Sequence, residues 1–224
     1  MTEFSFSDNQ ASSSQSRSSG FKETYVSKPI DVLDIKKTDE VPKTYIATGW
    51  FKPDNTDIVT LIQKAARGLI ERDYTFRVSA GELTQPVENN IIRLSPPMKV
   101  YKPWKSYENN DVEINEQYVS GSEPPNELFE YLAHYDAEFN SRSRGIQVFN
   151  AAFLWSILGD DLKTPPRFIL LHTWGRELKP SDITEKTNKK AALAIKVADD
   201  LQIPLYNLNE KQSKESFAEL LNQE

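Results

Sequence analysis

Apolar residues along this chain alternate between strand-like and helix-like spacing. Residues 44–48 form a short β-branched and aromatic run that ends at Gly49, which is typical of a strand. Apolar positions then recur at helical spacing from Ile58 to Leu69, and a second strand-like run covers residues 74–79. A strand, a helix and a strand within about 35 residues indicate a βαβ unit, whose crossover makes the two strands parallel.

The same alternation continues to the C-terminus. Residues 167–173 are an almost unbroken apolar run, as expected for a strand covered on both faces, whereas residues 106–126 are polar and predict a long loop. The other predicted strands cover residues 98–101 and 203–206, and the other predicted helices cover 126–139, 144–158, 189–201 and 213–221. We therefore predict an α/β, Rossmann-like domain with a mainly parallel sheet flanked by helices on both faces.

The N-terminal segment differs in composition from the rest of the chain. Residues 1–20 hold eight serines and few apolar groups, so they bury too little surface to offset the entropy lost on ordering. Residues 21–42 are more apolar and are expected to lie as an extended arm against the domain or a protein partner. The chain is thus divided into a disordered tail and arm, 1–42, and an α/β domain, 43–224.

Composition narrows the function classes. The chain has no cysteine, no run of eighteen apolar residues and no secretory signal pattern, which predicts a cytoplasmic protein without disulfides, thiolate metal sites or membrane spans. Its two histidines, His134 and His172, lie far apart in sequence, so we expect no metal and no cofactor. The net charge of −6 argues against a surface that coats nucleic acid as a whole, but a local basic groove stays compatible with it.

Four segments in a fixed order resemble a known superfamily. They are residues 101–107 (YKPWKSY), 158–165 (LGDDLKTP), 168–173 (FILLHT) and 194–208 (AIKVADDLQIPLYNL). Together they resemble the SLOG superfamily, in particular the YspA-like and DprA-like proteins of phages and bacteria. The resemblance implies a Rossmann-like fold, a phage origin and the host cytoplasm. It also implies a site at the carboxyl ends of the strands that takes nucleotides, nucleotide signals or single-stranded DNA.

The chain departs from that superfamily at its phosphate-binding turns. The resemblance implies glycine-rich turns after the first strand, after the second strand and before the last helix of the fold. Here these turns retain only Gly49 and Gly81, and Lys189, Lys190, Ala191 and Ala192 stand in the third. Glycine lets backbone N–H groups approach a phosphate at a helix N-terminus, so side chains here should close or reshape the pocket. We therefore predict a degenerate nucleotide pocket at Gly49, Gly81 and Glu88, and no catalytic residue.

Lysines and aromatic residues alternate after the third predicted strand. This composition suits single-stranded DNA, with lysines on phosphates and rings stacked on bases, although the tryptophan also fits a packing role. Lys189 and Lys190 stand at a helix start, where they hold a phosphate in place of the lost glycines or are merely solvated. The predicted nucleic-acid or phosphate site is Lys99, Lys102, Trp104, Lys105, Lys189 and Lys190.

The sequence therefore favours a non-catalytic protein that binds single-stranded DNA or a replication or transcription partner. Three alternatives stay open at this point: a nucleotide N-glycosidase, a nucleotide-signal-binding protein that counters host defence, and a structural component of the virion. Oligomerisation with copies of itself is also left open.

Overall fold

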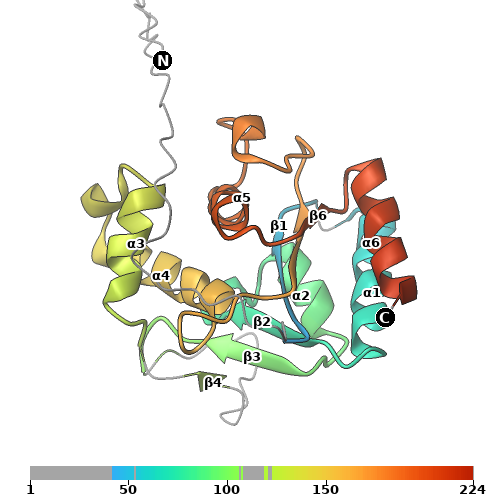
Figure 1. The fold of residues 1–224 in the computed structure, drawn as a ribbon, viewed down its shortest axis with the longest axis horizontal. Helices are drawn as coiled ribbons and strands as arrows, with labels where there is room; N and C mark the ends of the chain where they lie inside the picture. Colours follow the sequence, from blue (N-terminus) through green and yellow to red (C-terminus); the bar gives the residue numbers. More distant parts are fainter. Residues whose placement is uncertain (1–41, 53, 106, 108–118, 121–122, 224) are drawn as a thin grey trace, which may run out of the picture.

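The strands form one six-stranded, fully parallel sheet in the order β4-β3-β2-β1-β5-β6 (Figure 1). This computed structural model describes residues 42–52, 54–105, 107, 119–120 and 123–223. The predicted tail and arm lie outside the described residues except for Pro42. The strands are β1 (Thr44–Gly49), β2 (Thr75–Ser79), β3 (Met98–Tyr101), β4 (Val119–Ser120), β5 (Phe168–His172) and β6 (Leu205–Asn207).

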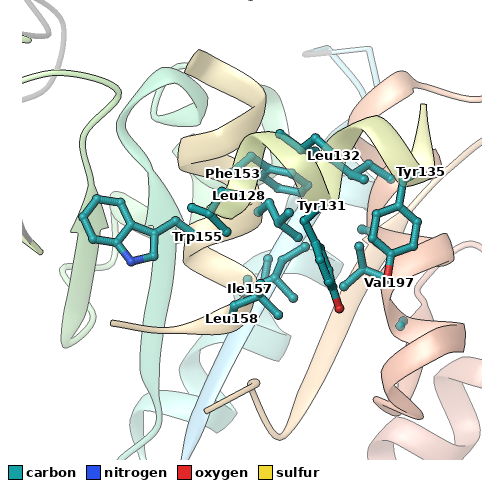
Figure 2. Close-up of a cluster of buried hydrophobic side chains, with 14 of the residues drawn as sticks. Leu128, Tyr131, Leu132, Tyr135, Phe153, Trp155, Ile157, Leu158 and Val197 are labelled. Carbon is teal, nitrogen blue, oxygen red and sulfur yellow. The ribbon is translucent and has the colours of Figure 1, made fainter. Parts of the chain in front are cut away.

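Helices cover both faces of the sheet, as predicted. Alternate residues of β1 point to opposite faces: Tyr45 and Ala47 pack in one buried cluster and Ile46 packs in the other. The first cluster is covered by α1 (Thr56–Ile70), α2 (Pro86–Ile92) and α6 (Lys211–Gln223), and the second by α3 (Glu127–Tyr135), α4 (Arg144–Leu158) and α5 (Lys189–Leu201). Figure 2 shows α3, α4 and α5 meeting in the second cluster, where Leu128 lies beside Phe153 and Val197 lies beside Tyr135.

The predicted class and most predicted elements are confirmed. β5 is buried along its whole length between β1 and β6, which explains the unbroken apolar run at 167–173. The helix predicted over 126–139 ends earlier, at Tyr135, and is followed by a short 3₁₀ turn, Phe139–Ser141. α2 and β4 were not predicted. α2 has seven residues, too few to display a helical repeat, and β4 consists of two residues inside the segment predicted to be a loop.

The order of the strands reverses beside β1. The chain adds β2 and β3 on one side of β1 and then returns to place β5 and β6 on the other side. In open parallel sheets, ligands bind in the crevice outside the carboxyl ends of the two strands at such a reversal. The carboxyl ends of β1 and β5, with the loops that leave the neighbouring strands at the same edge, are therefore the place to look for a site.

Candidate functional site at the carboxyl edge of the sheet

Gly49 ends β1 and lies directly against the end of β5. Its φ is +137°, and a Cβ placed there would collide with the backbone carbonyl of His172. That carbonyl accepts a hydrogen bond from the Trp50 N–H at 3.1 Å. Burial lowers the pKa of His172, whose Nδ1 lies 3.3 Å from the Trp50 carbonyl, so the imidazole brings no positive charge to this position near neutral pH. Gly49 was predicted to approach a phosphate. In the structure its lack of a side chain instead allows the ends of β1 and β5 to lie in contact.

Two exposed tryptophans flank this point. Trp50 follows β1 and Trp174 follows β5; they are 39% and 55% exposed, and their ring centroids lie 6.2 Å apart with the planes tilted by 48°. Only two other large hydrophobic side chains of the described residues, Ile146 and Leu178, are comparably exposed. Lys52 and Arg176, each two residues beyond one of the tryptophans, are exposed as well. The reversal of strand order therefore presents aromatic surface with cationic side chains nearby in the sequence.

A buried hydrogen-bond network fixes the loop that carries Trp174. The Glu177 carboxylate is 2% exposed and accepts hydrogen bonds from the hydroxyls of Thr173 and, at 2.6 Å, Thr187. Asn207, at the end of β6, donates through Nδ2 to the Thr173 hydroxyl at 2.6 Å and to the Glu177 carbonyl at 3.0 Å. Burial alone would raise the pKa of Glu177, but the hydrogen bonds from Thr173, Thr187 and the backbone together lower that pKa. An ionised, buried carboxylate thus ties the loop to β5, β6 and the residues before α5.

An aromatic ring occupies the space beside Gly81, the other retained glycine. A Cβ at this position would overlap the ring of Phe149 on α4. Phe149 also contacts Trp104 and Tyr107 edge to face, with centroid distances of 5.2 and 5.7 Å, and the latter two rings are 5.1 Å apart. Trp104 is therefore held in a cluster of three partly buried rings. Its packing role, one of the two readings of the sequence, is present in the structure.

Glu88 lies fully buried in α2, behind the ion pair of Glu82 and Lys190. Lys190 Nζ is 3.2 Å from Glu82 Oε1, 3.4 Å from the Phe149 carbonyl and 4.9 Å from the centre of the Phe153 ring. Glu88 is 1% exposed, and neither of its carboxylate oxygens makes a hydrogen bond of normal geometry. Burial first, and then the charge of Glu82, raise the pKa of Glu88 well above its ordinary value; nearby Lys190 opposes this shift only in part.

The structure separates the six residues predicted to bind nucleic acid. Lys105 and Lys189 are exposed, and Lys190 forms an ion pair with Glu82. Lys99 forms an ion pair with Asp160, in the loop that precedes β5 and hence at the opposite edge of the sheet, and Lys102 is 6% exposed. Trp104 and Lys190 both contact Phe149, and Lys105 and Lys189 adjoin them in sequence at the carboxyl edge, whereas Lys99 lies at the opposite edge.

The third predicted phosphate turn, before α5, already has its backbone donors occupied. The Asn188 side chain accepts hydrogen bonds from the N–H groups of Lys190, at 2.9 Å, and Ala191, at 3.4 Å. A phosphate at this helix terminus would have to displace that cap. Sequence reasoning did not identify Trp50, Trp174, Glu82 or Glu177; the available signal was that both tryptophans come within two residues of the end of a predicted strand.

Searches with the sequence and the structure match no protein-family model, no curated protein and no solved structure. The SLOG resemblance therefore stays a prediction. In the described part of the chain, no group of three or more acidic or histidine side chains is placed to hold a metal ion. No helix in the same part is long and apolar enough to cross a membrane.

Proposed function

We propose that this protein is a non-catalytic binding protein that holds single-stranded DNA along the carboxyl edge of its sheet. The observation that carries the proposal is the exposed pair Trp50 and Trp174 at the reversal of strand order. Exposed tryptophan rings provide stacking surface for any base, and such stacking needs no particular sequence.

The spacing of the strands suits an extended ligand. Trp104 follows β3, Trp50 follows β1 and Trp174 follows β5, in that spatial order along the edge. Neighbouring strands lie about 4.8 Å apart, so the strand ends from β3 to β5 span about 14 Å. At 3.4 Å per stacked nucleotide this span corresponds to about four nucleotides. A strand of DNA is a better match to a row of this length than a mononucleotide is.

The exposed cations supply attraction for the phosphates. Lys52, Lys105, Arg176 and Lys189 are exposed and belong to loops or helix starts at this edge. Because the whole chain carries a net charge of −6, a polyanion is attracted only where such side chains are concentrated. The proposed site therefore relies on local charge, and its affinity should fall steeply with salt.

Several features of the same edge disfavour hydrolysis of the N-glycosidic bond of a nucleotide. A general acid must reach the bond that it protonates, but Glu88 is buried beneath the edge. Glu82 is paired with Lys190, and Gly49 and Gly81 contact protein atoms where a phosphate-binding turn would leave space. These contacts favour binding over the alternative of a nucleotide N-glycosidase.

The test compares single substitutions in one DNA-binding assay. Anisotropy of a labelled oligothymidine of about 15 nucleotides measures Kd for wild type, Trp50→Ala, Trp174→Ala and Trp174→Phe. Each alanine variant should bind about 5- to 150-fold more weakly, which corresponds to the ~1–3 kcal/mol typical of one stacked base. Trp174→Phe should retain most of the affinity because it keeps a ring.

Leu178→Ala is the matched control, since Leu178 is exposed on the same loop but has no ring. Folded Trp50→Ala and Trp174→Ala variants that bind as tightly as wild type would overturn the proposal.

A further inference from the structure

A groove of about 400 Å³ runs between α1 and α2. This volume lies in the range of small-molecule sites. None of the residues that line the groove belongs to the proposed DNA site. Six of the eight carry side chains with hydrogen-bond donors or acceptors: Thr56, Thr60, Thr84, Asn89, Asn90 and Arg93.

Two side-chain amides of α2 line the groove and are held in place by the protein. Asn90 is 8% exposed; its Nδ2 donates to the Pro86 carbonyl at 2.8 Å and its Oδ1 accepts from Gln63 Nε2 at 3.4 Å. Asn89 donates weakly to the Leu83 carbonyl at 3.5 Å, which leaves its side-chain oxygen as an acceptor. Two amides are thus oriented by the protein at the surface that a ligand would contact.

Several side chains that line the groove have hydrogen-bond donors and acceptors that no other described protein group occupies. Among the described residues, no hydrogen bond or ion pair involves the side chains of Thr56, Thr60, Thr84 or Arg93. Each hydroxyl both donates and accepts, and the guanidinium donates from a planar fork. Hydroxyls and amides together match the alternating donors and acceptors of a sugar.

The charge of the lining is positive. Arg93 is its single charged residue, and no Asp or Glu lines the groove. Arg93 directly follows α2, and Thr84 stands two residues before it. The seven helical residues between them span about 10 Å. The cationic end and the hydroxyl-rich end of the groove are therefore separated along its length.

We propose that this groove is a second binding site, which takes a small sugar phosphate. The phosphate pairs with Arg93, and the sugar hydroxyls bond with the threonine hydroxyls and the amides of Asn89 and Asn90. A forked guanidinium is well matched to the oxygens of a phosphate. This inference is independent of DNA binding, because the two sites share no residue.

Isothermal titration calorimetry with ribose 5-phosphate and glucose 6-phosphate tests the groove; ribose and inorganic phosphate are the partial probes. We expect both sugar phosphates to bind wild type more tightly than either partial probe. Arg93→Gln should weaken binding ~10-fold or more, as expected for a hydrogen bond to a charged group. Thr84→Val should weaken it by a smaller factor.

Arg67→Gln is the matched control, because Arg67 is an exposed arginine on α1 outside the groove. It should bind like wild type, and so should Trp174→Ala, whose defect is confined to DNA. The proposal is overturned if neither sugar phosphate binds at millimolar concentration, if Arg93→Gln binds like wild type, or if inorganic phosphate binds as tightly as the sugar phosphates.

Discussion

Replacing Glu88 with glutamine should make the protein more stable at neutral pH. Glutamine has nearly the same shape as the protonated acid, and it cannot ionise. In the wild type, burial and the neighbouring charge of Glu82 raise the pKa of Glu88 well above its ordinary value of 4.5. The folded state therefore keeps a proton that the unfolded chain releases.

The sign and the size of the effect follow from linkage. Between pH 4.5 and the raised pKa of the folded state, unfolding releases the Glu88 proton, so stability falls as pH rises. One proton corresponds to a slope of up to ~1.4 kcal/mol per pH unit in the free energy of unfolding. The contribution of Glu88 to the free energy of unfolding does not change with pH below pH 4.5. It also stops changing above the raised pKa, where Glu88 is ionised in the folded state as well. Glu88→Gln removes this slope, so its advantage over wild type should grow with pH.

Urea unfolding at several values between about pH 5 and 8 measures this difference, with the fluorescence of buried Trp155 as one probe. Subtracting the two curves cancels groups that titrate alike in both proteins, such as Glu177, which does not contribute to the Glu88 shift. Glu71→Gln, at an exposed position, is the matched control and should leave the difference from wild type flat. A difference between Glu88→Gln and wild type that is also flat, or that favours wild type near pH 8, would show that the folded protein does not hold a proton on Glu88.

Residues at the carboxyl edge should affect stability and DNA binding in different ways. Gly49→Ala should lower the free energy of unfolding by more than ~2 kcal/mol in urea titration, because its Cβ meets backbone that cannot move aside. Glu177→Gln should weaken DNA binding as well as stability, since the loop of Trp174 loses its anchor; unchanged Kd in a folded variant would contradict this. Lys105→Gln and Lys189→Gln should each reduce the magnitude of the log–log salt slope by about 0.7, whereas exposed Lys64→Gln should not change it. Chromatography of nucleoside monophosphates incubated with the protein should detect no free base above a no-protein blank.

The sheet could be predicted because its signals are local. The apolar run of β5 marks a strand covered on both faces, and the βαβ spacing at the N-terminal side of the domain implies parallel strands. α1 likewise begins with a local signal, because the Asn55 side chain accepts from the Ile58 N–H at 3.2 Å. α2 was not predicted because its seven residues are too few to show helical spacing of apolar residues.

The site could be predicted only in part, since its contacts join residues far apart in sequence. Gly49 and Gly81 were expected to face a ligand, but His172 and Phe149 contact them from β5 and α4. Which lysines remain exposed also depends on distant partners, such as Asp160 for Lys99. The tryptophans at the reversal of strand order become neighbours only once the order of the strands is known.

Whether this protein binds single-stranded DNA is measured by the anisotropy of the labelled oligothymidine with the wild-type protein at about 50 and 200 mM salt. We expect saturable binding at the lower salt and a clear loss of affinity at the higher, with a log–log slope of about −0.7 for each cation that contacts a phosphate. The absence of binding at the lower salt, or an affinity that does not change with salt, would contradict the proposed function.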